Sequence, residues 1–447
     1  MPLASARLLH IKVTQVTSPR QRDRVIIVIS DPSRIDLEWV LPLIDELAAE
    51  NINLEIFDFS APVPRDHSNY WVRALRLIGY EPSLSADLEP VPSSVARTLD
   101  LMRSSKNYAL SLLGAWYFSA KSPLNALFPF TSWREKKRRE KIFGLMESAS
   151  CIFTPLRKKD RPETLPEGEL LAAARESGVP IIGFPMVADQ FLPHRTVMQC
   201  DYALVNTAPQ VDTLPAHRNT VTVAAMPPKF TQRWLGRLNQ IYERLAEAPR
   251  LPADRDIVLV ILKNDTSVIW SGLDFFGTAR HLIDRLLIDG AFLVLKPHPR
   301  QSPSALRRLT AGLDHNDFCV AEGPLSYWAQ RADRVVSLFS GGSLDALAVG
   351  KVPILFWPLA DSFSEKMNSE RLDDSFAKLD ESGRPTTRYS ELCHEVTSEF
   401  FELPSSIDDS GPLERFRALY PATKDCRQIK ALIPAYQQQR GQPHDQL

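Results

Sequence analysis

The second half of the sequence alternates apolar runs with amphipathic runs, and this alternation constrains the fold more than any other feature. Ile257–Leu262 has the sequence IVLVIL, an unbroken apolar run rich in β-branched residues. Such runs are typical of strands buried on both faces of a parallel sheet. Further strand-like runs, separated by helical patterns, follow at 291–296, 317–323, 334–339 and 352–357. We therefore predict a doubly wound α/β domain here.

The first half carries the same pattern less regularly. Arg24–Ser30 is an apolar run, and Asp31-Pro32 follows it with a typical N-cap and first-turn proline. A helical pattern then leads to another strand-like run at 52–59, which predicts a parallel strand–helix–strand unit. Strand-like runs return at 151–156, 179–185 and 202–207, after a largely helical stretch.

The segment between the two halves indicates a domain boundary. It contains Pro227-Pro228, a helical pattern and a proline-rich polar exit before Ile257. We predict an N-terminal Rossmann-like domain over 1–226 with a helical insertion at about 90–150, a C-terminal Rossmann-like domain over 227–400, and a helical tail over 401–447.

Composition excludes several classes of protein. A net charge of −1 gives no signal for nucleic acid, and no apolar run is long enough for a membrane-spanning helix. The N-terminus lacks the apolar region of a secretory signal. Five scattered cysteines without CxxC spacing favour reduced thiols and a cytoplasmic protein. Zinc-ligand spacing, a Walker A loop, HExxH, a nucleophile elbow and GxGxxG are all absent from the sequence.

A histidine between two prolines is the first candidate site. His298 follows the strand-like run 291–296 in the sequence Lys296-Pro297-His298-Pro299-Arg300. The prolines restrict the backbone on both sides, so the imidazole is held rigidly beyond the strand end. It can then donate to a phosphate oxygen, with Lys296 and Arg300 adding positive charge. The alternative is a loop histidine that binds a backbone carbonyl.

Two more polar clusters follow predicted strands of the same domain. Ser340-Gly341-Gly342-Ser343 lies between a strand and a helix, where N–H groups and glycines can form an anion site. Asp345, in the first helical turn, suits the helix dipole or a ribose hydroxyl. Lys263-Asn264-Asp265 follows the run at 257–262, where the lysine can reach a phosphate and the aspartate a sugar hydroxyl. Tight turns with capping residues are the alternative interpretation of both clusters.

These three clusters are predicted to meet. The carboxyl ends of parallel strands share one edge of a sheet, and ligands of doubly wound domains bind there. In the first domain Asp31 occupies the corresponding position and is our candidate general base, with helix capping as the alternative. Asp189 and His194 are rival candidates, and a structural role is the alternative for each.

A basic run, Trp133–Lys141 (WREKKRREK), follows an apolar stretch. Its lysines and arginines could contact an anionic membrane or an acidic polymer. Because two glutamates interrupt the run, a solvated helix face is the alternative.

At "LVLKPHPRQ" and "RVVSLFSGGSLDALAVGKVPILF" the chain resembles bacterial capsule and surface-polysaccharide glycosyltransferases of the Kdo-transferase and polysialyltransferase type. The resemblance covers roughly residues 255–360 and implies the GT-B architecture, two Rossmann-like domains facing a cleft. It implies that His298 and Pro299 contact the donor phosphate, often that of a CMP-activated sugar, and that the Ser340–Ser343 element contacts the nucleotide, with Asp345 as its acidic position. The chain departs from that family in its two glycines between the serines and in lacking a clear Asp/Glu-Asp/Glu-Gly element; "PEGE" at 166–169 is a partial echo in an expected loop.

Together these features predict a glycosyltransferase that moves a sugar, such as Kdo or sialic acid, from a nucleotide donor to a surface polysaccharide or glycolipid. We expect no metal or other cofactor, because the nucleotide-sugar is a co-substrate. We expect no nucleic-acid partner, and a cytoplasmic location with peripheral contact to the inner face of the membrane or to an assembly complex. The alternatives are a nucleotide-sugar 2-epimerase, a CDP-alcohol phosphotransferase and a non-catalytic GT-B-like partner.

Overall fold

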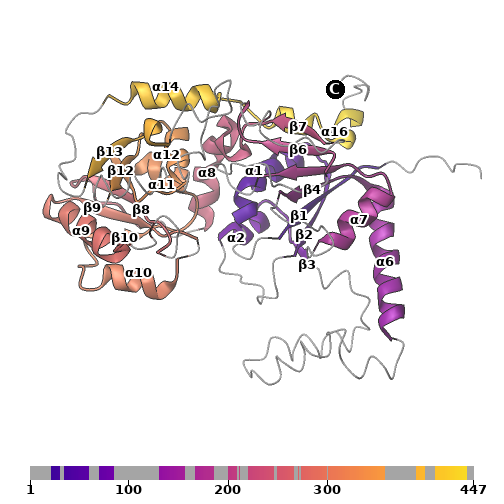
Figure 1. The fold of residues 1–447 in the computed structure, drawn as a ribbon, viewed down its shortest axis with the longest axis horizontal. Helices are drawn as coiled ribbons and strands as arrows, with labels where there is room; N and C mark the ends of the chain where they lie inside the picture. Colours follow the sequence, from indigo (N-terminus) through magenta and orange to yellow (C-terminus); the bar gives the residue numbers. More distant parts are fainter. Residues whose placement is uncertain are drawn as a thin grey trace, which may run out of the picture.

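The computed structural model describes residues 22–30, 35–59, 70–84, 130–156, 167–185, 200–208, 211, 220–245, 249–265, 270, 273–299, 301–357, 389–397 and 408–439. Two parallel sheets lie side by side, with helices packed around each of them and α8 between them (Figure 1). The remaining residues lie outside this description.

The first sheet has seven strands in the order β3-β2-β1-β4-β5-β6-β7, and every described pairing is parallel. Its central strands are almost entirely buried, as the apolar runs predicted. The strands are β1 (Arg24–Ile29), β2 (Asn53–Asp58), β3 (Ser83–Leu84), β4 (Ala149–Pro155), β5 (Ile181–Phe184), β6 (Tyr202–Val205) and β7 (Val221–Ala224). The helices of this part are α1 (Ile35–Ala49), α2 (Tyr70–Leu77), α6 (Phe130–Ser148) and α7 (Gly168–Glu176).

The second sheet has six parallel strands in the order β10-β9-β8-β11-β12-β13. The strands are β8 (Ile257–Ile261), β9 (Phe292–Lys296), β10 (Phe318–Val320), β11 (Arg334–Ser337), β12 (Ile354–Trp357) and β13 (His394–Thr397). The connecting helices are α9 (Phe275–Ile288), α10 (Pro303–Thr310), α11 (Leu325–Arg331) and α12 (Ser343–Ala348), and the short helix η7 (Tyr389–Leu392) precedes β13.

Both sheets reverse their strand order beside their first strand, between β1 and β4 and between β8 and β11. This is the order of a doubly wound Rossmann-like domain, and the reversal is where such domains bind ligands. The predicted fold class, two Rossmann-like domains of the GT-B type, is confirmed. Of the helical insertion predicted at about 90–150, α6 lies within the described residues. The predicted tail contains α14 (Ser410–Leu419), α15 (Arg427–Lys430) and α16 (Pro434–Gln439).

Three short strands at the sheet margins were not predicted. β3 has two residues, β7 falls just before the predicted connection, and β13 has the polar sequence HEVT. Such edge strands gain their conformation from pairing with a neighbour, which a single sequence does not reveal. The predicted boundary at 226/227 lies between β7 and the 3-10 helix η4 (Pro228–Phe230), and α8 (Gln232–Leu245) follows.

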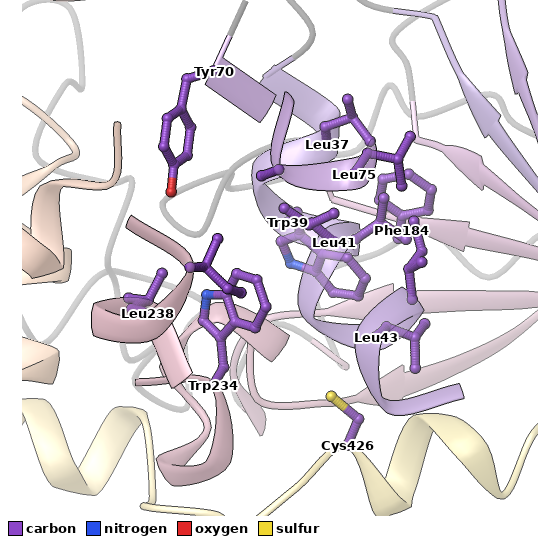
Figure 2. Close-up of a cluster of buried hydrophobic side chains, with 14 of the residues drawn as sticks. Leu37, Trp39, Leu41, Leu43, Tyr70, Leu75, Phe184, Trp234, Leu238 and Cys426 are labelled. Atoms are coloured by element: carbon purple, nitrogen blue, oxygen red, sulfur yellow. The ribbon is translucent and has the colours of Figure 1, made fainter. Parts of the chain in front are cut away.

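One hydrophobic core runs through both domains. It includes the buried strands β1 and β8 and two residues of the helix α8, Trp234 and Leu238 (Figure 2). Tyr242 of α8 packs against Tyr70 of α2 and against Tyr327 of α11, with ring centroids 6.0 and 3.9 Å apart. Because α8 contacts helices of both domains, it carries the core across the boundary.

The C-terminal segment crosses back to the first domain. Its helix α14 lies over the second domain and α16 over the first (Figure 1). Lys430 of α15 is buried between Glu46 of α1 and Glu50, the residue after that helix, with Nζ at 2.9 and 2.8 Å from their carboxylate oxygens. Burial by itself would lower the pKa of Lys430, but these carboxylates outweigh it and raise the pKa. The tail is therefore tied to the domain where the chain begins.

The basic run lies on α6. Arg138 pairs with Glu169 and Arg139 with Glu176, both on α7, while Lys136 and Lys141 are exposed. Two arginines of the basic run thus form ion pairs with α7. Contact of the run with a membrane stays a prediction. In the described part of the chain, no helix is both long and apolar enough to cross a bilayer.

Candidate nucleotide site at the strand ends of the second domain

The three polar clusters predicted to meet follow three neighbouring strands. Lys296, the last residue of β9, is in register with Ile261 of β8, which in turn is in register with Ser337 of β11. The loops after these residues carry His298, Lys263 and Ser340. The structure therefore brings the clusters to one edge of the sheet, on both sides of its order reversal.

Lys296 is held by backbone carbonyls. Its Nζ donates to Gly323 O at 2.6 Å and lies 3.5 Å from Ala321 O, both in the loop between β10 and α11. Burial lowers the pKa of Lys296 to about 8, although Glu38, Asp345 and Glu322 act in the opposite direction. The ammonium is thus poorly compensated by charge, and an incoming anion would stabilise it.

His298 lies in a short, braced loop. Its carbonyl oxygen accepts from Gln301 N at 2.8 Å, and α10 begins two residues later behind its N-cap, Ser302. Ser302 Oγ accepts from Ala305 N at 3.1 Å, and this capping bond fixes the point at which the loop ends and α10 begins. His298 is half-buried and Pro299 is exposed. The imidazole therefore lies near the surface at this edge of the sheet. Arg300 lies outside the described residues.

The serine turn after β11 is stabilised from within. Ser337 Oγ accepts from Ser340 N at 3.2 Å and from the hydroxyl of Ser343 at 2.9 Å. Ser340 Oγ lies 3.4 Å from Gly342 N, and Ser337 and Ser343 are fully buried. These serines therefore shape the turn; their contact with a nucleotide, and that of Gly341, stay predictions.

Two backbone features show how tightly this turn is fitted. Phe339 has a φ of +57°, a left-handed conformation that is unfavourable for a bulky side chain. A Cβ on Gly342 would lie 2.6 Å from Leu325 Cδ1, so α11 packs directly against the glycine backbone. A side chain at position 342 would require the end of the Leu325 side chain to shift.

Asp345 makes an ion pair that the sequence did not reveal. Its Oδ2 accepts from Lys229 Nζ at 2.8 Å, and the same Nζ donates to Glu38 Oε1 at 2.6 Å. Burial by itself would lower the pKa of Lys229, but the Asp345 and Glu38 carboxylates outweigh it and raise the pKa. Lys229 is a lone cation in AAMPPKF, an apolar, proline-rich context that could have marked it as a buried ion. Binding of a ribose by Asp345 stays a prediction.

The cluster after β8 lies between the other two clusters, because β8 is the middle one of the three neighbouring strands β9, β8 and β11. Lys263, Asn264 and Asp265 are half-buried, and Leu262 N just before them donates to Lys296 O at 2.9 Å. This bond continues the β8–β9 ladder one residue past the strands. The loop therefore leaves the sheet beside the His298 loop.

The first domain offers two buried carboxylates at the end of β1. Ser30 N donates to Asp36 Oδ2 at 2.6 Å, and Ser30 Oγ lies 3.3 Å from Glu167 Oε1. Glu167 precedes the first residue of α7, so the helix begins within the PEGE segment that we expected to be a loop. The candidates Asp31, Asp189 and His194 lie outside the described residues.

Among the residues that the structure describes, no group of three or more His, Cys, Asp or Glu side chains is placed to hold a metal ion.

No protein-family model matches the chain, and no curated protein matches it. Among solved structures it is similar to the glycotransferase of kitacinnamycin, at 13% identity and a TM-score of 0.47, over 95% of this chain and 100% of that one. It is similar to UDP-GlcNAc 2-epimerase from Methanocaldococcus jannaschii, at 10% identity and a TM-score of 0.46, over 92% and 98%. It is also similar to MurG from Acinetobacter baumannii, at 10% identity and a TM-score of 0.42, over 92% and 99%. Similarities of this size do not indicate what the chain binds.

Proposed function

We propose that this protein is a glycosyltransferase that moves a sugar from a nucleotide donor to a glycan or glycolipid acceptor. The observation that carries the proposal is the meeting of three polar loops at the order reversal of the second sheet. Helix α1 of the first domain reaches this region through Glu38. A donor held on the second domain would thus face the domain that we assign to the acceptor.

The donor phosphate is assigned to the loops after β8 and β9. His298 would donate to it, while Lys296 and Lys263 would balance its charge as the nucleotide leaves. The N–H groups of Ser340 and Ser343 already have acceptors within the turn, so we assign the turn to shaping the nucleotide pocket. The required positive charge would come from side chains.

The acceptor hydroxyl needs a base in the first domain. Asp31 follows directly on Ser30, at the end of β1, where the sheet order reverses. A carboxylate at that position would remove the proton of the hydroxyl as the sugar is transferred. We therefore retain Asp31 as the proposed base.

The test measures binding of CMP, UDP and CDP, and sugar transfer from their sugar conjugates, with the full-length chain. His298→Ala should weaken binding of the preferred nucleotide by about tenfold or more, because a hydrogen bond to a charged group contributes about 1.5–3 kcal/mol. His281→Ala, which removes an exposed histidine from α9, is the matched control and should leave affinity unchanged. Unchanged affinity in His298→Ala would refute the phosphate assignment.

The same experiment separates the other functions. An epimerase would change the donor sugar without an acceptor, and a CDP-alcohol phosphotransferase would release CMP from a CDP-alcohol. A non-catalytic partner protein would bind no nucleotide, and that result would remove all the enzymatic proposals together.

A further inference from the structure

Lys229 lies where three parts of the chain meet. It belongs to η4 in the connection between the domains, and its Nζ binds Glu38 of α1 and Asp345 of α12. The side chains of Lys229 and Asp345 are 10% and 6% exposed, so little water competes for these bonds. One ammonium therefore joins a helix of the first domain to a helix of the second.

This group of charges is strongly asymmetric. Two carboxylates share one cation, so removing the lysine would leave two like charges facing each other in a poorly solvated place. The loss of one member of a buried ion pair is costly because the remaining charge keeps its desolvation penalty. Lys229 also remains charged at any ordinary pH, since its pKa is raised. The connection is therefore permanent and does not act as a pH switch.

Asp345 transmits the position of Lys229 to the serine turn. Its backbone N donates to Gly342 O at 3.0 Å, Leu344 N donates to Gly341 O at 3.2 Å, and Ser343 N donates to Ser340 O at 2.9 Å. On its other side the turn contacts the end of the Leu325 side chain through Gly342. A displacement of Asp345 must therefore displace the turn.

We propose that Lys229 is a positioning residue, which holds the Ser340–Ser343 turn in place relative to α1 of the first domain by binding Asp345 and Glu38. The inference rests on the proposed function in one respect only, namely that the turn contributes to nucleotide binding. The mechanical part of the inference stands on the contacts alone.

Lys430 provides a matched control. It is also a buried lysine between two carboxylates, but Glu46 lies on α1 and Glu50 directly after it, and neither is next to the turn. Lys430→Met therefore also removes a buried ammonium that is shared by two carboxylates. A role in general stability would make Lys229→Met and Lys430→Met behave alike at the turn.

The experiment compares amide hydrogen exchange of residues 337–348 in the full-length chain. The amides of Ser340, Ser343, Leu344 and Asp345 are bonded within the turn and report directly on its opening. In Lys229→Met we expect exchange there to become about tenfold faster or more, while Lys229→Arg, which restores the charge, stays within about threefold of the wild type. Lys430→Met should leave these amides unchanged. Equal exchange in Lys229→Met and Lys430→Met would overturn the proposal.

Two further measurements keep the result decisive. If Lys229→Met does not fold, Glu38→Gln removes one partner while leaving the Asp345 bond, and a smaller increase at 337–348 is expected; no increase there contradicts the proposal. Affinity for UDP and CMP should fall in Lys229→Met and be largely recovered in Lys229→Arg. If the wild type binds neither nucleotide, the proposed function fails, whereas hydrogen exchange still decides the role of Lys229.

Discussion

Two lysines, Lys229 in the connection between the domains and the half-buried Lys296 at the end of β9, have pKa values that move in opposite directions. Lys229 touches two carboxylates, which raise its pKa in spite of burial. Lys296 touches the carbonyl oxygens of Gly323 and Ala321, and burial lowers its pKa to about 8. The same carboxylates, Glu38 and Asp345, influence both residues.

The difference indicates that the kind of partner, and not burial alone, sets the pKa of a lysine. The carbonyl of Gly323 accepts a hydrogen bond from Lys296 without neutralising its charge. Lys229 is therefore fitted to hold the protein together, and Lys296 is fitted to receive an anion. This contrast leads to three predictions.

The largest effect is expected from removing each lysine at neutral pH. Lys229→Met should lower the free energy of unfolding by about 3–5 kcal/mol, because Glu38 and Asp345 lose their shared cation. Lys296→Met should change it by only about 1 kcal/mol, since the lost bond to Gly323 is offset by the removal of a poorly compensated charge. Denaturant titrations of both variants give the two values. Similar losses would mean that the two environments are not energetically different.

An intermediate effect is expected from pH. The folded-state pKa of Lys296 is below its unfolded value of 10.5, so the unfolded chain binds the proton more tightly. The contribution of Lys296 to the free energy of unfolding is therefore lowest below about pH 8 and rises as the pH increases towards 10.5. The rise is at most about 1.4 kcal/mol for each unit by which the pKa is lowered. Unfolding of the wild type and of Lys296→Met at several pH values in this window measures the rise by difference. Parallel curves would contradict the lowered pKa.

The smallest and most specific effect concerns ligand binding. If a nucleotide phosphate binds next to Lys296, the pKa of the lysine rises again, and formation of the complex at about pH 9 takes up close to one proton. Calorimetry with UDP or CMP in buffers of different ionisation enthalpy measures this uptake. Lys296→Met should abolish the uptake at about pH 9. Binding without proton uptake would place the phosphate away from Lys296.

The sequence predicted the order of the central elements well because their signals are local. Runs such as IVLVIL at Ile257–Leu262 mark strands buried on both faces, and the helical pattern before the run at 52–59 corresponds to α1. The cap predicted at Asp31-Pro32 lies outside the described residues. The margins were harder, since β3, β7 and β13 depend on a neighbouring strand for their conformation. The alternation of strand and helix patterns predicted an α/β domain on each side of Pro227-Pro228, and the family resemblance over roughly residues 255–360 implied that the two form a GT-B architecture.

The site was predictable to the extent that topology determines it. The meeting of the Lys263, His298 and Ser340 loops followed from the rule that parallel strands share an edge. The bond from Lys229 to Glu38 and Asp345 could not be predicted, because it joins residues separated by 191 and 116 positions. Nor does a sequence show that the hydroxyl of Ser343 is used inside its own turn.

The return of the C-terminal segment also determines how the two domains can move. The chain passes between the domains twice, and the two passages are bonded to each other, Gln232 N to Thr423 O at 3.0 Å and Arg233 N to Lys424 O at 3.1 Å. A single linker would permit swivelling in any direction, whereas two joined passages leave essentially one rotational degree of freedom. Lys229 is three residues from this axis, where rotation causes little displacement. Its ion pairs would therefore persist under such a rotation.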